Sequence, residues 1–158
     1  MRKKALILNC STHCSTLDNN GGAGPSSAPT SPDIRPQYHF RKIDGHTHIW
    51  DVRKLIGIAE GLPVKDIPLT QISEIDETYW FDGSGPVPTC RAILDHMRLI
   101  ENADLRWPII LCPNARVMDG MHRVLKALLV GNTAIQTRSL VTLPLPDFVD
   151  VAPSDLPY

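Results

Sequence analysis

Residues 108–131 place two short apolar runs, a turn signal and an amphipathic helix in immediate succession, and this order limits the folds open to the chain. Pro113-Asn114 marks the turn between the two runs, and Asp119-Gly120 precedes the helix. Gly131-Asn132 is a stop signal for that helix. The spacing i, i+3, i+4, i+7, i+8 predicts one buried helix face, which comprises Met121, Val124, Leu125, Leu128 and Leu129.

The start of this helix is suited to binding an anion. The first N–H groups of a helix have no intrahelical partner, and the helix dipole adds partial positive charge there. Gly120 permits close approach of the backbone, and Asp119 can cap the helix. His122 and Arg123 would add hydrogen-bond donors and charge. The alternative is an ordinary capped amphipathic helix with two exposed polar residues, and the residue types alone favour it.

Length, charge and cysteine content set further limits. A chain of 158 residues suits one domain, and 16 Lys+Arg against 17 Asp+Glu give no overall positive field that would attract nucleic acid. No apolar run approaches the roughly 18–20 residues that cross a membrane. Four cysteines do not form a disulfide framework, which favours a reducing compartment, and we expect a cytoplasmic protein.

Composition divides the chain into three parts. Residues 1–38 are rich in Ser, Gly, Asn and Pro, cannot bury a core, and are expected to be a disordered leader. Residues 39–143 are expected to form one small α+β domain. Residues 144–158 form a proline-rich tail, which we expect to lie extended against the domain or to be partly mobile.

The central part is predicted to alternate helices and strands. Helical spacing predicts a helix over 49–59, and a short apolar run predicts a strand over 64–69. A second helix is predicted over 89–100, with an apolar stripe of Ile93, Leu94, Met97 and Ile100. The final strand is predicted over 135–143, and Asp82–Pro86 is predicted to be a loop.

The motif Asp119-Gly120-Met121-His122-Arg123, followed by Ala127, resembles the signature of the ParB/sulfiredoxin superfamily. In that superfamily a Gly-x-x-Arg segment at a helix start cradles nucleotide phosphates. The resemblance covers about residues 62–143, since the predicted order of strand, helix, strand and helix also matches. Small bacterial ParB-like proteins are similar in addition at Tyr79–Phe81 and Pro88–Arg91. The resemblance implies a ParB/sulfiredoxin-like mixed sheet with packed helices, and a nucleotide (ATP, ADP or CTP) bound with Mg²⁺ at residues 119–123.

Two departures from the family narrow the implied activity. Sulfiredoxins use a cysteine just before the His-Arg pair, and here Met121 stands in that place, so thiol chemistry of that kind is not expected. ParB partition proteins continue into a helix-turn-helix region, whereas this sequence continues into a proline-rich tail. We therefore do not expect DNA to be a partner.

A third branch of the superfamily phosphorylates a free amino acid and uses a carboxylate placed after the first strand. Asp76 and Glu77 lie in the comparable stretch, with Glu74 close by, and are the candidate catalytic residues. The alternative is that this acidic stretch is a solvated loop. Three functions stay open: a nucleotide-dependent phosphotransferase, a non-catalytic nucleotide-binding switch, and an accessory protein of DNA partition.

A second candidate site comprises Thr89-Cys90-Arg91 together with His96. A cation in the first turn of a helix is disfavoured by the dipole, which hints that Arg91 faces an anion, and the alternative is a surface arginine. Cys90 could be a reactive thiol at a helix start, although a small buried residue is the more conservative interpretation.

The segment Asp44-x-His46-x-His48 resembles the first metal-ligand motif of amidohydrolases. Those barrels typically need about 250 residues, so a metal-dependent hydrolase is only a remote alternative. We expect these histidines to be polar surface groups at a helix start, and we assign no metal ligands. The sequence therefore predicts an α+β domain with a phosphate site at the start of the helix that follows Gly120.

Overall fold

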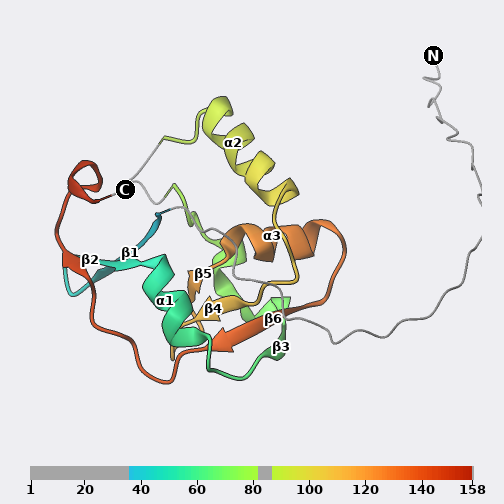
Figure 1. The fold of residues 1–158 in the computed structure, drawn as a ribbon. Helices are drawn as coiled ribbons and strands as arrows, with labels where there is room; N and C mark the ends of the chain where they lie inside the picture. Colours follow the sequence, from blue (N-terminus) through green and yellow to red (C-terminus); the bar gives the residue numbers. More distant parts are fainter. Residues whose placement is uncertain (1–35, 82–86, 158) are drawn as a thin grey trace, which may run out of the picture. The chain divides into compact units, whose positions relative to one another are not determined.

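The structure is a computed structural model that describes residues 36–81 and 87–157. These residues belong to one compact unit that spans Asp33–Tyr158. They form three α-helices and two small sheets, which confirms the predicted α+β class (Figure 1). The leader predicted for residues 1–38 lies outside the described residues except for its last three positions, and so does the loop predicted at Asp82–Pro86.

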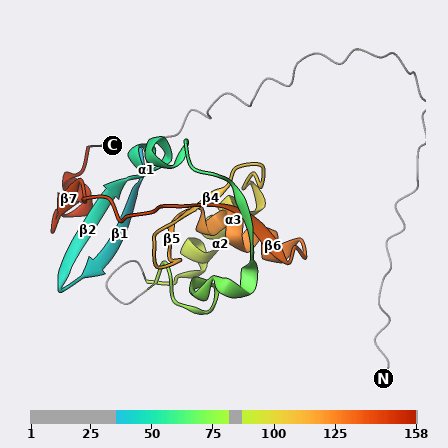
Figure 2. The ribbon, with the colours of Figure 1, turned by 90° about the horizontal axis from the view of Figure 1, so that it is seen from below.

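The first sheet has three antiparallel strands in the order β1 (Tyr38–Ile43), β2 (His46–Asp51) and β7 (Phe148–Val149), which lie side by side in Figure 2. Asp44 and Gly45 join β1 to β2 with φ angles of 50° and 86°. Positive φ at both central positions matches the right-handed twist of a hairpin, and Asp-Gly is the usual sequence for such a turn.

The helix predicted over 49–59 is therefore wrong at its start. The chain continues as a strand through Asp51, and α1 comprises only Val52–Ala59. The Asp51 side chain caps α1 by accepting a hydrogen bond of 2.9 Å from the Arg53 N–H. Ile49 is buried, but as a residue of strand β2 rather than of a helix. Its match to the helical spacing is therefore a coincidence.

The second sheet is mixed and has the strand order β3 (Lys65–Pro68), β6 (Ala134–Ser139), β4 (Ile109–Leu111) and β5 (Val117–Asp119). Strands β4 and β6 are parallel, whereas the other neighbours are antiparallel. Two short 3₁₀ helices, η1 (Leu69–Gln71) and η2 (Ser73–Asp76), follow β3. The last strand is shorter than the predicted 135–143, since β6 ends at Ser139.

The second sheet is buried on both faces. Ile109 and Leu111 pack with Val124 of α3 (Met121–Leu129), while Ile110 between them packs with Leu55 of α1. Successive side chains of a strand point to opposite faces, so the unbroken apolar run Ile109-Ile110-Leu111 contributes side chains to the hydrophobic clusters on both faces of the sheet. Figure 1 shows α1 and α3 next to β4 and β5.

Two predicted helix faces are less buried than their periodicity indicated. In α3 the buried residues are Met121, Val124 and Ala127, whereas Leu128 and Leu129 are 48% and 61% exposed. Helix α2 (Cys90–Glu101) has no buried residue. Its stripe lies beside α3, and the two helices leave an apolar groove of about 320 Å³ lined by Met97, Ile100, Glu101, Leu125, Leu128 and Leu129.

The tail predicted at 144–158 takes part in the first sheet. Besides the pairing of β7 with β2, Trp50 Nε1 donates a hydrogen bond of 2.9 Å to the Pro144 carbonyl. The Asp147 carboxylate accepts a bond of 2.8 Å from the Asp51 N–H and forms an ion pair with Lys54. A last 3₁₀ turn, η3 (Pro153–Asp155), follows β7. These bonds tie the tail to the same β2–α1 corner that packs on the second sheet.

Candidate functional site

The predicted motif lies where β5 passes into α3. Gly120 is the N-cap position of α3 and has φ of 103°, a backbone conformation that favours glycine. A Cβ atom at this position would lie 2.7 Å from Nη2 of Arg123 and 2.7 Å from Cγ2 of Ile109. The absence of a side chain therefore lets the guanidinium of the first helical turn fold back over the start of its own helix.

Asp119 does not cap the helix as predicted. It is the last residue of β5, and its Oδ2 forms an ion pair of 2.6 Å with Nη2 of Arg123, four residues later. Both side chains are largely buried, with 14% and 21% of their surface exposed. Arg123 also approaches the Pro108 carbonyl at 3.5 Å. Its Nε is buried without a hydrogen-bond partner among the described residues.

His122 belongs to a cluster of aromatic rings that bridges α3 and α2. Its Nε2 is 3.0 Å from Nδ1 of His96, and the Trp80 indole stacks on both imidazoles, with centroid distances of 4.0 Å to His96 and 4.6 Å to His122. Phe81 meets His96 edge-on at 5.5 Å. The structure thus joins two candidate sites that the sequence left separate, through His96 and His122.

The hydrogen bond between the two imidazoles requires one nitrogen with a proton and one without. Burial lowers the pKa of His96 below its usual value, against the opposing effect of Asp95. This part of the site presents aromatic ring faces, and the neighbouring Arg123 guanidinium carries a full positive charge.

The other predicted residues of the second site, Thr89, Cys90 and Arg91, lie at the start of α2. Arg91 is exposed in the first turn of this helix. Cys90, interpreted conservatively as buried, is exposed. The Thr89 hydroxyl caps α2 by accepting a bond of 3.2 Å from the Ala92 N–H.

The acidic stretch after β3 is organised by Arg116. Both oxygens of Glu77 accept bonds of 2.6 Å from Arg116, which lowers the pKa of Glu77 below its usual value. Glu74 is buried, and its Oε1 accepts a bond of 2.7 Å from the Val117 N–H and lies 3.0 Å from Nε of Arg116. Asp76 is exposed. The carboxylate that contacts Arg123 is thus Asp119, and neither Asp76 nor Glu77 does so.

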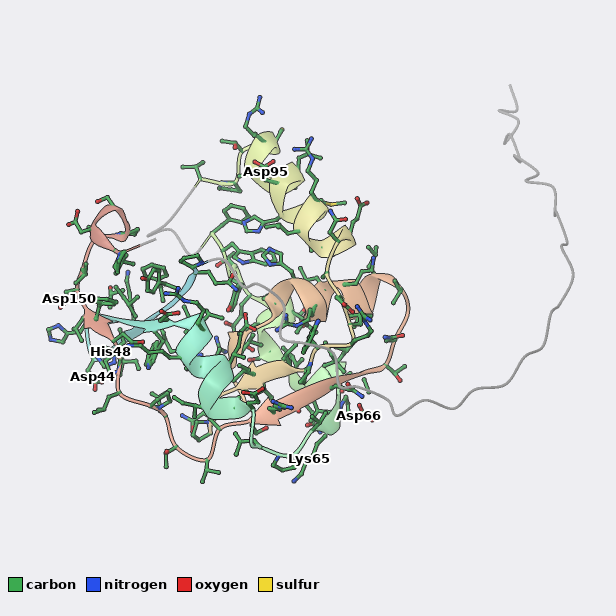
Figure 3. The ribbon with its side chains drawn as sticks, viewed as in Figure 1. Asp44, His48, Lys65, Asp66, Asp95 and Asp150 are labelled. Atoms are coloured by element: carbon green, nitrogen blue, oxygen red, sulfur yellow. The ribbon has the colours of Figure 1, made fainter. Side chains whose placement is uncertain are left out.

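The Asp-x-His-x-His segment forms the β1–β2 turn and the start of β2, which corrects its predicted place at a helix start. Nδ1 of His46 lies 2.6 Å from Oδ2 of Asp150, which raises the pKa of His46 and lowers that of Asp150. Asp44 and His48 lie nearby (Figure 3). Among residues 36–81 and 87–157, no group of three or more His, Cys, Asp or Glu side chains is arranged to hold a metal ion.

Comparisons of the chain with protein-family models, with curated proteins and with solved structures find no match. No helix in the described part of the chain is both long enough and apolar enough to cross a membrane. A functional assignment therefore rests on the geometry of the chain itself, above all on the Arg123 and His122 side chains at the start of α3.

Proposed function

We propose that the start of α3 binds the phosphate groups of a nucleotide, with ATP, ADP and CTP as the candidates. The observation that carries this proposal is the Arg123 guanidinium, which lies against Gly120 in the first helical turn with its Nε buried and unbonded among the described residues. A buried donor without a partner costs about 1–3 kcal/mol, and a phosphate oxygen would supply the missing acceptor.

The helix start itself favours the same ligand. Gly120 has no side chain with which to cap α3, and the dipole of this nine-residue helix places partial positive charge at its first turn. Asp119 already occupies one edge of the guanidinium, so a phosphate would bind the remaining donors or displace this carboxylate. Exchange of one anion for the other is a simple basis for a nucleotide-dependent change at the β5–α3 junction.

The rings beside Arg123 suit the remainder of a nucleotide. Trp80 is partly exposed and offers an indole face, and the imidazole rings of His96 and His122 stack against it. Aromatic faces stack on nucleobases with a strength of about 1–3 kcal/mol per base. A base could add to this stack or take the place of one imidazole.

We also infer a ParB/sulfiredoxin-like fold for residues 62–143. The order β3, α2, β4–β5 hairpin, α3 and β6, with β4 and β6 parallel, agrees with what the sequence resemblance implies. Within that proposal the protein is a nucleotide-binding domain. The carboxylates suggested for phosphoryl transfer do not meet Arg123, because Glu77 is held by Arg116 and Asp76 is exposed. This geometry favours a binding switch over a phosphotransferase.

Calorimetric titration with ATP, ADP and CTP, with and without Mg²⁺, tests the phosphate site. Arg123→Gln should weaken binding by about 10-fold or more, as expected for loss of a charge-assisted hydrogen bond. His122→Gln should weaken it less, because it retains a hydrogen-bonding side chain but loses the ring. Arg98→Gln on α2, an exposed arginine paired with Asp95, is the matched control and should bind as the parent does.

Folding must be checked separately, since Arg123 is largely buried. Arg123→Lys retains the positive charge without the planar fork, so folded Arg123→Lys with weakened binding would support a guanidinium-specific contact. Absence of saturable binding to all three nucleotides, or unchanged affinity in folded Arg123→Gln, would show that the proposal is wrong. Incubation with nucleoside triphosphate, Mg²⁺ and free amino acids distinguishes the two activities, because a phosphotransferase would release nucleoside diphosphate together with a phosphorylated amino acid, whereas hydrolysis would release inorganic phosphate.

A further inference from the structure

A second basic site lies at the turn of the β4–β5 hairpin, at the opposite end of β5 from Gly120. A pocket of about 520 Å³ opens there between β1 and the hairpin turn. We call it the basic pocket, and its lining comprises Arg41, Lys42, Ile43, Cys112, Pro113, Asn114, Arg116 and Leu143. Ligand pockets in proteins usually have volumes of about 300–1,000 Å³, so this one can hold a small organic molecule.

Nearby carboxylates neutralise some of the positive charges of the basic pocket but not others. Arg116 forms ion pairs with Glu74 and Glu77, which offset its charge. Arg41 and Lys42 form no ion pair with any carboxylate among the described residues. Both residues line the pocket without an acidic partner among the described residues, and an anion would be attracted to their positive charge.

Arg41 is held in place for such a ligand. Its Nη2 donates a bond of 3.1 Å to the Val117 carbonyl, and its Nη1 lies 3.4 Å from Sγ of Cys112. A guanidinium has more N–H donors than these two bonds use, and its planar fork suits the two oxygens of a carboxylate or phosphate. Because the side chain is already ordered, a ligand would lose little entropy in fixing it.

The pKa of the neighbouring Cys112 thiol is lowered in part by the positive charge of Arg41. Burial acts to raise the pKa of Cys112, but the Arg41 guanidinium and the backbone N–H groups of Arg116 and Asn114 outweigh it, so the pKa lies below its usual value. Ile43, Pro113 and Leu143 form an apolar wall beside these polar groups. Inorganic phosphate alone would leave most of the volume empty, whereas an anion with an apolar body would fill it.

We propose that the basic pocket binds a small organic anion, whose carboxylate or phosphate group contacts Arg41 and whose apolar body lies against Leu143, with Lys42 adding positive charge nearby. This inference goes beyond the nucleotide site, because it uses none of the residues at the start of α3. The ligand chemistry is an oxyanion joined to a compact apolar group.

Benzoate and phenyl phosphate are suitable probes, with benzyl alcohol as the neutral match. In titrations followed by amide NMR, both anions should shift the signals of residues 41–43 and 112–116, and the stronger of the two identifies the preferred head group. Arg41→Gln should weaken anion binding by about 10-fold or more, and Lys42→Gln by about 2- to 5-fold, since Lys42 is exposed.

The control variants separate this pocket from the nucleotide site. Arg98→Gln and Arg123→Gln should leave benzoate binding unchanged, whatever the second variant does to nucleotides. If Arg41→Gln fails to fold, Lys42→Gln keeps the test open, because Lys42 has no ion-pair partner among the described residues. The proposal is overturned if millimolar anions leave these amides unshifted, if benzyl alcohol binds equally well, or if Lys42→Gln and folded Arg41→Gln bind as the parent does.

Discussion

Substitution of Gly120 by alanine tests the closeness of Arg123 to the start of α3. Two independent costs are expected at this position. The first is backbone strain, because an L-residue rarely adopts the φ of 103° that Gly120 has. The second is overlap, because the new Cβ would lie 2.7 Å from both Arg123 Nη2 and Ile109 Cγ2. The Arg123 guanidinium can shift away, but Ile109 is fully buried and tightly packed, so its overlap with the new Cβ is harder to relieve.

The two costs can be given magnitudes. Placing a non-glycine residue in a left-handed conformation costs about 1–2 kcal/mol. Overpacking a tightly filled site adds typically 1–3 kcal/mol, here partly through disturbance of the Asp119–Arg123 ion pair. The free energy of unfolding of Gly120→Ala should therefore fall by about 2–5 kcal/mol, a large part of the stability of an ordinary domain.

Gly131→Ala is the matched control, since Gly131 has φ of 80° but no atom of the described residues lies within 4 Å of its Cβ position. This variant should show the strain alone, a loss of about 1–2 kcal/mol. Urea denaturation followed by tryptophan fluorescence gives both values, provided that the slope of the transition is unchanged. Equal losses for the two variants would refute the close approach of Arg123 and Ile109 to Gly120.

Two further predictions concern buried polar groups. Burial and then the Arg41 charge lower the pKa of His39 from 6.5 to about 3, so the folded chain resists its protonation while the unfolded chain accepts a proton. Stability linked to His39 is complete above about pH 6.5 and is lost as the pH falls toward about 3. Between about pH 7 and 4.5 the free energy of unfolding of the parent should fall by about 2.5 kcal/mol more than that of His39→Phe in urea titrations, and equal losses would contradict this. Glu74→Ala should lower the free energy of unfolding by about 2–4 kcal/mol, because it strips the Val117 N–H of its partner and leaves a cavity, and a loss under about 0.5 kcal/mol in the same assay would show that this bond is dispensable.

The sequence was most informative where the interactions are local. In residues 108–131 the apolar spacing and the Asp119-Gly120 and Gly131-Asn132 signals predicted β4, β5 and α3 correctly. The helix predicted to start at Ile49 was wrong at its start, because strand β2 passes directly into α1 without a loop. Apolar residues of β2 therefore happened to extend the helical spacing of α1. Strand β7 is only two residues long and left no periodic signal.

Burial was the less predictable property of the helices. Helical spacing identifies an apolar face but does not tell what covers it. Leu128 and Leu129 continue the apolar spacing of α3, but both are exposed and line the groove beside α2. The number of residues that a helix buries depends on the width of the surface under it, which is set by strands distant in the sequence.

The proposed sites combine local and distant contacts. Asp119, the last residue of β5, and Arg123, in the first turn of α3, are four residues apart and belong to one sequence motif, so the sequence alone assigned them to one site. His96 and His122 are 26 residues apart, and Arg41 and Cys112 are 71 apart. Such pairs meet only because α2 packs on α3 and because β1 reaches the β4–β5 turn. His96 and His122 were candidates in separate segments, and Arg41 and Cys112 were not candidates at all, so the contact within each pair comes from the fold. A polar residue that has no local role in a single sequence is therefore the kind most in need of a structure before it is dismissed.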